Sequence, residues 1–189
     1  MRAALPIRNV KRKRRLQDHG AIHAAAAPGE PTRGVLRFRG LALPVALGRA
    51  GIRANKFEGD GATPRGVFRL VRLWWRADRM KRPMTCLPVR AIRSDDGWCE
   101  DAQDRRYNRA VRLAPDAPGD RLMREDHLYD LVVELDHNTR PRIRNRGSAV
   151  FIHVARAGFA PTAGCVALEA GDLKRLLARI GPRAKIEIG

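Results

Sequence analysis

The sequence predicts a mainly β domain that ends in a single helix, and three observations support this fold class. Short apolar runs rich in β-branched or alternating residues recur along the chain, separated by turns that contain Gly, Pro, Asn or Asp. Apolar side chains follow a clear helical spacing near the C-terminus, at residues 170–180, and Gly181 and Pro182 end that helix. Residues 184–188 then alternate as a last strand. We expect a β-sandwich or barrel-like sheet braced by this C-terminal helix.

The first 31 residues are expected to form a basic tail that precedes a single domain over residues 32–189. The tail holds a Lys/Arg cluster at 11–15 and then an alanine-rich run in which Ile22 is the only large apolar residue. This run is too weakly apolar for a signal peptide, and no stretch of the chain has the length of a membrane span. We therefore expect a disordered or weakly helical tail, no membrane span and, for a chain that starts at Met1, a cytoplasmic protein.

A β-hairpin is expected at the start of the domain, from residues 35–39 and 41–47 with its turn at Gly40. Leu36 and Phe38 should face the core together, since side chains two apart share one face of a strand. This hairpin opens the predicted sheet.

A glycine-rich loop follows at residues 48–61 and contains Lys56, Glu58 and Asp60. Charged residues in such a loop are usually solvated, so we expect these three to have no part in catalysis. A turn at residues 63–66 then leads back into the sheet.

Two more strands are expected at residues 67–75 and 128–135. The long, weakly patterned stretch between them, residues 77–128, is expected to cover a cleft. His137 lies in the turn after the second of these strands and is expected at the surface.

Residues 148–168 carry the candidate chemistry. An apolar strand at 149–154 has one polar side chain near its end, His153, and a loop then leads to Cys165, which follows Gly164. A free thiol with a pKa of ~8.5 is mostly protonated at neutral pH, so a nearby imidazole would activate it as a nucleophile. Gly164 permits a tight turn that would aim the backbone amides of Gly164 and Cys165 at a developing oxyanion. On residue types alone, a buried structural cysteine and a hydrogen-bonded core histidine are the more common explanation.

The charge of the chain leaves a second class of function open. The sequence has 38 Lys and Arg residues against 20 Asp and Glu residues, a net charge of +18. This balance favours acidic partners, and a non-catalytic basic module that binds a polyanion is the alternative from another class. The charge is spread along the chain, aromatic residues make up only 5% and no nucleic-acid motif is present, so nucleic acid is not an expected partner.

The three cysteines, Cys86, Cys99 and Cys165, do not predict a metal site. No two of them have the two-residue spacing typical of a zinc site. Their odd number leaves at least one free thiol, and a disulfide between Cys86 and Cys99 stays open.

Five separated pieces of the chain share one pattern. Residues 162–168 read TAGCVAL and follow a strand that carries His153. The other pieces, in order, are EGDGATPRGVF at 58–68, DGWC at 96–99, YN at 107–108 and GS at 147–148. From about residue 32 to the C-terminus the chain thus resembles the L,D-transpeptidase catalytic domain (YkuD) family. It departs from that pattern at Ala163, where many members have His, and at Ala167, where many have Arg or Asn.

The resemblance implies that Cys165 is the nucleophile and His153 the base of an acyl transfer on peptidoglycan stem peptides. Cys165 attacks the carbonyl of the L-centre in the third residue of a tetrapeptide, the terminal D-Ala leaves, and the thioester is resolved by an amine or by water. Neither a metal nor another cofactor is needed, because the broken peptide bond supplies the acyl group. The expected substrate contacts are Thr162, Tyr107, Asn108 and Arg144.

Two other enzymatic hypotheses remain beside transpeptidation. In the cytoplasm the available donors would be stem peptides from recycled cell wall, and water as acceptor would make the protein an L,D-carboxypeptidase that trims tetrapeptide to tripeptide. A papain-like cysteine protease is disfavoured, because its cysteine would precede its histidine in the sequence, whereas His153 precedes Cys165 here.

Overall fold

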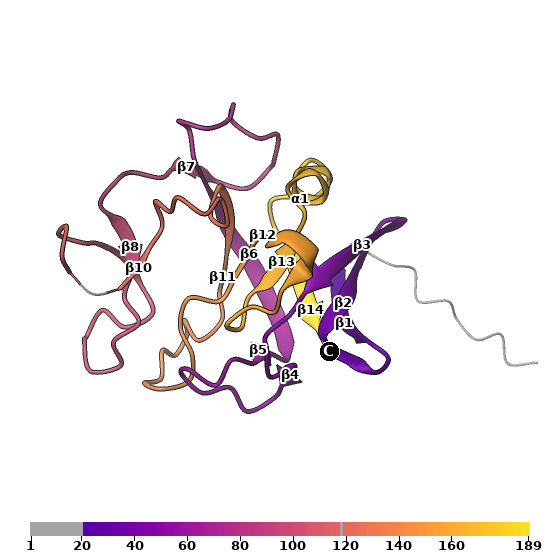
Figure 1. Cartoon of the computed structure of the whole chain (residues 1–189), viewed down its shortest axis with the longest axis horizontal. Helices are drawn as coiled ribbons and strands as arrows, with labels where there is room; N and C mark the ends of the chain where they lie inside the picture. The colour runs from indigo at the N-terminus through magenta and orange to yellow at the C-terminus, as the bar shows by residue number, and fades with distance from the viewer. Residues whose placement is uncertain (1–20, 118) are drawn as a thin grey trace, which may run out of the picture.

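Nine strands form the central sheet of the computed structural model, which describes residues 21–117 and 119–189 (Figure 1). Their order is β11-β12-β13-β3-β2-β1-β14-β6-β7, and a further pairing of β11 with β6 closes all of them except β7 into a barrel-like ring. The predicted mainly β fold class is therefore confirmed. The strands are β1 (Ile22–Ala27), β2 (Glu30–Phe38), β3 (Leu41–Ala46), β6 (Gly66–Trp75), β7 (Val89–Ala91), β11 (Leu131–Leu135), β12 (Phe151–Val154), β13 (Val166–Leu168) and β14 (Lys185–Ile188).

Two small sheets and two short helical segments complete the described chain. One sheet pairs β4 with β5, and the other has β8 between β9 and β10. Their bounds are β4 (Ile52–Arg53), β5 (Thr63–Pro64), β8 (Asp96–Trp98), β9 (Ala110–Arg112), β10 (Asp120–Arg121), the 3-10 turn η1 (Ala157–Phe159) and the helix α1 (Ala170–Leu177). Within the described residues, no helix has the length and apolar character needed to cross a membrane.

Strand β1 shows that the expected tail over residues 1–31 is wrong at its C-terminal end. It pairs antiparallel with β2 and parallel with β14, so its backbone is hydrogen-bonded on both edges. Ile22 and Ala24 are buried in the core. Alanine has a low strand propensity, but pairing with residues far along the chain outweighs that local preference. Residues 1–20, which include the basic cluster, lie outside the described residues.

The predicted hairpin is confirmed in β2 and β3. Phe38 pairs with Leu41, which leaves a two-residue turn. Arg39 and Gly40 in that turn have positive φ values of 41° and 78°, as a type I′ turn requires. Leu36 and Phe38 are both buried, so the prediction that they face the core together is confirmed.

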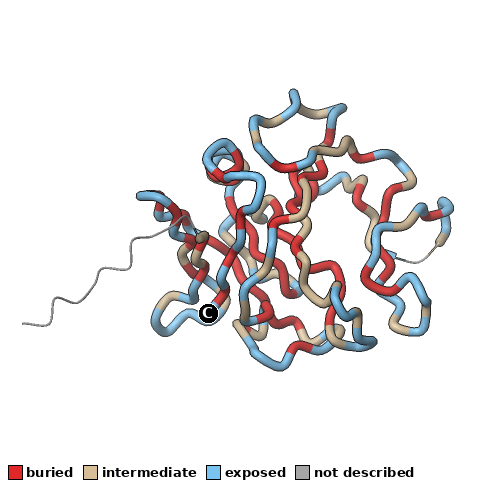
Figure 2. The backbone as a smooth tube through the Cα atoms, turned by 180° about the vertical axis from the view of Figure 1, so that it is seen from behind, coloured by how far each residue is buried: buried red, intermediate tan, exposed pale blue. Residues whose placement is uncertain are grey.

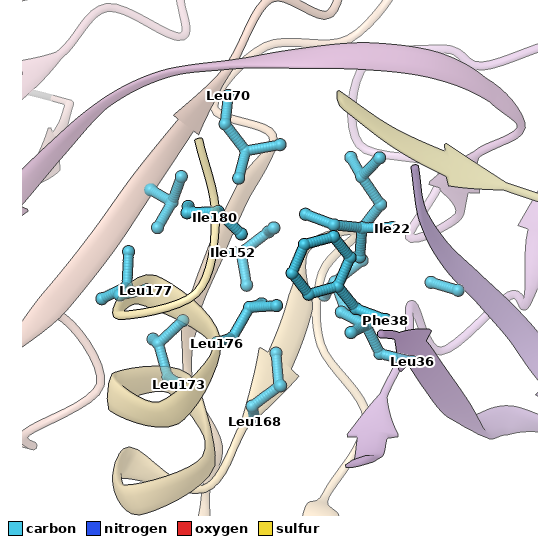
Figure 3. Close-up of a cluster of buried hydrophobic side chains, with 14 of the residues drawn as sticks. Ile22, Leu36, Phe38, Leu70, Ile152, Leu168, Leu173, Leu176, Leu177 and Ile180 are labelled. Atoms are coloured by element: carbon cyan, nitrogen blue, oxygen red, sulfur yellow. The ribbon is translucent and has the colours of Figure 1, made fainter. Parts of the chain in front are cut away.

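Helix α1 packs its leucines onto the strands that carry the candidate site (Figure 3). Leu173, Leu176 and Leu177 are fully buried, because residues three and four apart lie on one face of a helix. They share a buried cluster with Ile152 of β12 and Leu168 of β13. Burial of one leucine stabilises a fold by about 2 kcal/mol, so this face fixes both strands firmly.

A second buried cluster joins β8, which lies in the segment of residues 77–128, to the strand β12 and to Cys165. Trp98 of β8 packs edge-on against Phe151 of β12, with ring centroids 5.0 Å apart. Tyr129 and Cys165 belong to the same cluster. Figure 1 shows β8 and β10 on the side of β6 and β11 away from β1–β3. Figure 2 shows buried residues along the central strands and exposed ones along the outer loops.

Candidate active site

A cavity of about 530 Å³ opens beside β12 and β13. Cys165 and His153 both line it, so the structure brings the predicted nucleophile and base to one site. The three cysteines are free thiols, and the disulfide that the sequence left open does not form. Further lining residues include Arg49, Lys56, Glu58, Glu100, Asp120, Arg124, Tyr129, Ser148, Arg156, Thr162, Gly164 and Ala167.

Two neighbouring parallel strands, β12 and β13, position His153 and Cys165. β12 pairs with β13 so that His153 lies beside Ala167. Side chains alternate along an extended chain, so Cys165, two residues before Ala167, projects from the same face as His153. The loop between β12 and β13 therefore connects His153 to Cys165.

Cys165 is buried and hydrogen-bonded just before β13. Its thiol donates to the carbonyl oxygen of Ala149 at 3.2 Å, and its Sγ accepts from the amide of Phe151 at 3.3 Å. Burial raises the pKa of this thiol to about 12, and the negative charges of Asp120 and Glu100 act in the same direction. The hydrogen bond from Phe151 favours the thiolate but does not outweigh burial, so the resting thiol is protonated.

His153 is oriented by the backbone at the end of β12. Its Nδ1 lies 2.8 Å from the carbonyl oxygen of Val154, and because a carbonyl only accepts, Nδ1 carries the hydrogen. Nε2 is then the atom that can take a proton. Burial lowers the pKa of the imidazole to about 4, and the positive charges of Arg124 and Arg156 lower it further. The resting pair is therefore a neutral thiol and a neutral imidazole.

Thr162 organises the turn before the nucleophile. Its hydroxyl donates to the carbonyl oxygen of Cys165 at 2.7 Å and accepts from the amide of Gly164 at 3.1 Å. The Gly164 amide, which we expected to face an oxyanion, is thus occupied inside the turn. A role for this amide in catalysis requires that hydrogen bond to be exchanged.

Lys56 is buried beneath the same turn, so the expectation of a solvated loop is wrong. Its Nζ donates to Asp60 at 2.6 Å and to the carbonyl oxygen of Phe57 at 2.7 Å. The Asp60 carboxylate also accepts from two backbone amides of the loop, which folds the loop around the ion pair. A Cβ on Gly164 would lie 3.6 Å from Cε of Lys56, so the lysine stem packs against the nucleophile turn. Lys56 and Glu58 both line the cavity.

The order of the motifs matches one family along most of the chain. The sequence model of the L,D-transpeptidase catalytic domain, YkuD, matches residues 29–188. The chain belongs to this family. The resemblance inferred from the cysteine segment is therefore confirmed, and the match contains both Cys165 and His153.

Two solved L,D-transpeptidases are similar to this YkuD domain at 13% identity. An L,D-transpeptidase from Mycobacterium smegmatis aligns over 90% of this chain and 59% of its own, with a TM-score of 0.41. L,D-transpeptidase 1 from Mycobacterium tuberculosis aligns over 89% of this chain and 62% of its own, with a TM-score of 0.36. The chain thus spans about three fifths of the length of these two structures. A search of curated proteins gives no match to the sequence.

Asn108, an expected substrate contact of this YkuD domain, lies behind the cavity wall. Its Oδ1 accepts from the indole nitrogen of Trp98 at 3.0 Å and from the amide of Ala149 at 3.2 Å. Its Nδ2 donates to the carbonyl oxygens of His137 and Asn138 at 3.0 and 2.9 Å. Asn108 thus binds the amide of Ala149, the residue whose carbonyl oxygen accepts the thiol hydrogen bond of Cys165. His137 is half-buried rather than a surface residue, since its ring packs edge-on against Phe68.

Tyr107 and Arg144 are not among the residues that line the cavity, whereas Thr162 is. Tyr107 is buried and donates its hydroxyl hydrogen to Glu58, which holds that acid at the cavity wall. Arg144 is exposed, and its guanidinium lies 3.5 Å from Gln103. Of the four expected substrate contacts, the structure therefore places Thr162 beside the pair.

Sequence reasoning missed the aromatic and charged wall next to His153. The Tyr129 ring lies edge-on to the imidazole with centroids 5.4 Å apart, and its hydroxyl donates to Asp120 at 2.7 Å. The guanidinium of Arg124 lies 5.0 Å from the centroid of the Tyr129 ring. Asp120 and Arg124 come from the weakly patterned segment, where no spacing marks them. Arg156 follows His153 by three residues, and that closeness was the available signal.

Proposed function

We propose that this chain catalyses a cysteine-dependent acyl transfer on peptidoglycan stem peptides through a thioester intermediate. Membership of the YkuD family supports peptidoglycan L,D-transpeptidase-type function. The finer assignment rests on one observation, the shared cavity into which Cys165 and His153 project from adjacent strands. Stem peptides are the proposed partners of this cavity.

His153 is the base and then the acid of the first half-reaction. Its Nε2 takes the thiol proton as Sγ of Cys165 attacks the carbonyl carbon of the L-centre, which forms a C–S bond and an oxyanion. We assign the backbone amide of Cys165 as a donor to that oxyanion. When the oxyanion collapses, the C–N bond breaks and the imidazolium gives its proton to the amine of the leaving D-Ala.

The neutral resting pair determines how this reaction begins. With a pKa of about 4 for His153 and about 12 for Cys165, no standing thiolate–imidazolium pair exists at neutral pH. Proton transfer is then coupled to attack on the carbonyl rather than completed before it. Catalysis depends on a bound substrate that holds its carbonyl carbon against the sulfur.

The acceptor decides between transfer and hydrolysis in the second half-reaction. An amine of a second stem would form a cross-link, whereas water would release a tripeptide and make the protein an L,D-carboxypeptidase. We propose the hydrolytic route as the alternative for a cytoplasmic enzyme, which would meet small stem peptides from recycled wall rather than the polymer.

The test is incubation of the purified protein with a disaccharide tetrapeptide, with and without an excess of a D-amino acid or a second stem, followed by mass spectrometry. Exchanged or dimeric product supports transpeptidation, and tripeptide alone supports hydrolysis. Cys165→Ala is the control and should give neither product. A wild-type protein that leaves the tetrapeptide intact under both conditions would overturn the proposed function.

A further inference from the structure

Charged side chains of both signs line the cavity around Cys165 and His153. Asp120 and Glu100 line the cavity close enough to Cys165 for their negative charges to raise the pKa of its thiol. Arg124 and Arg156 line it close enough to His153 for their positive charges to lower the pKa of its imidazole. The separation of the two signs is partial, since Lys56 also acts on the thiol and Asp120 lies 3.5 Å from Arg124. Near His153, however, the two cavity-lining side chains whose charges act on the imidazole are both arginines.

Of the two arginines, Arg156 makes the weaker contacts with other side chains of the described chain. Its side chain is 59% exposed, and it forms a long ion pair with Asp126, whose carboxylate oxygen lies 4.0 Å from the guanidinium. Arg124 instead donates to both oxygens of Asp126, at 2.9 and 2.6 Å, and lies over the Tyr129 ring. A guanidinium carries five donors in a planar fork that matches a carboxylate, so Arg156 can accept an anionic ligand without breaking a close contact.

The chemistry of the proposed reaction places a carboxylate on this side. His153 must deliver its proton to the nitrogen of the leaving residue, so that nitrogen lies next to the imidazole. If the leaving residue is the last of the peptide, its carboxylate carbon is about 2.5 Å from that nitrogen, two bonds away.

We propose, on the basis of the proposed function, that Arg156 binds the free carboxylate of the leaving residue, with Arg124 adding positive charge beside it. Arg156 is then the residue through which the cavity selects a peptide whose scissile bond precedes a C-terminal residue. Cleavage within a longer stem is disfavoured, because the following peptide bond brings no negative charge to Arg156.

The experiment compares a tetrapeptide that has a free C-terminal carboxylate with the same peptide as a C-terminal amide. The wild-type enzyme should cleave the acid roughly 10- to 100-fold more efficiently in kcat/KM, the range of one charge-assisted hydrogen-bonded contact. Arg156→Gln should remove this preference through a KM that rises far more for the acid than for the amide, and Arg156→Lys should restore part of it. Arg37→Gln, an exposed change on β2, is the matched control and should keep the full preference.

A binding measurement separates this inference from the proposed function. In the Cys165→Ala background, calorimetric titration should show tighter binding of the acid than of the amide, and Arg156→Gln should abolish that difference. Such a result supports the carboxylate site even if the wild-type protein turns over neither peptide, in which case only the proposed function fails. Equal affinity for acid and amide, or an equal loss for both in Arg156→Gln, overturns the inference.

Discussion

The Nδ1 atom of His153 donates a hydrogen bond to the carbonyl oxygen of Val154, the next residue along the chain, at 2.8 Å. This contact fixes the tautomer and leaves Nε2 unprotonated toward the cavity. A backbone carbonyl thus does the orienting that a third side chain does in many catalytic triads. The orientation of this imidazole is therefore set at the end of β12 by the backbone of the next residue.

Replacement of His153 by glutamine should lower kcat/KM by a factor on the order of 10²–10⁴, the usual cost of losing a general base. Steady-state cleavage of the tetrapeptide measures it. His23→Gln is the control, because His23 lies on β1, is 45% exposed and pairs with Glu187 away from the cavity. Near-full activity in His153→Gln, or a similar loss in His23→Gln, would show that the base is misassigned.

Alkylation should report the protonated state of the resting thiol. Because burial raises the pKa of Cys165 to about 12, its reaction with iodoacetamide at pH 7.5 should be much slower than that of the exposed Cys86. The rate at Cys165 should rise continuously as the pH is raised to 10. Peptide mass mapping distinguishes the sites, with Cys165→Ser to confirm the assignment. Faster labelling of Cys165 than of Cys86 at pH 7.5 contradicts a neutral pair.

The buried imidazole also predicts an acid limb in stability. His153 has a folded-state pKa of about 4 against 6.5 when unfolded, so the unfolded chain binds the proton first as the pH falls. Its contribution is fully present above pH 6.5 and is lost progressively as the pH falls toward 4. The free energy of unfolding should drop by about 2 kcal/mol from this group between pH 7.5 and pH 5.

Urea unfolding of wild type and His153→Gln at both pH values isolates this effect. Carboxylates titrate equally in the two proteins, whereas glutamine does not titrate. The difference in stability between them should therefore shift toward the variant at pH 5. A pH-independent difference would mean that the imidazole is not held neutral by burial.

The features that depend on residues close together in the sequence could be predicted. The hairpin turn at Gly40, the apolar face of α1 and the strand near whose end His153 lies each follow from spacing over a few residues. The catalytic pair was reached through motif order, since nothing in the residue types alone favours catalysis over a buried cysteine and histidine.

What the sequence could not show depends on contacts between distant segments. β1 is a strand because β2 and β14 pair with it on both edges, although its alanines have no strand preference. Lys56 can be buried because its ammonium group is paired with the carboxylate of Asp60. That carboxylate also accepts hydrogen bonds from two backbone amides of the same loop. Asp120 reaches Tyr129, whose ring packs against His153, only after residues 77–128 fold against β12, and no spacing in the sequence indicates that contact.

Gly164 should tolerate no larger residue, and alanine is the sharpest probe. Its φ is 146°, a region that favours glycine, and a Cβ there would lie 2.8 Å from the carbonyl oxygen of Ala62, a backbone atom with little freedom to move. Gly164→Ala should cost about 1–3 kcal/mol of stability. Activity should fall further than stability alone explains, because the displaced turn carries the nucleophile Cys165. A 1 Å misplacement of a reacting group can cost about 10²-fold in rate.

Gly158→Ala is the matched control for this prediction. Gly158 lies in the same loop and also has a positive φ, 67°, but a Cβ there would have no atom within 4 Å. Both variants thus carry backbone strain, and only Gly164→Ala adds a collision beside Cys165. Thermal unfolding and tetrapeptide cleavage should show modest destabilisation with nearly normal kcat for Gly158→Ala, and loss of kcat for folded Gly164→Ala. Equal kcat in the two variants would mean that close contact between the turn and Ala62 does not position the nucleophile.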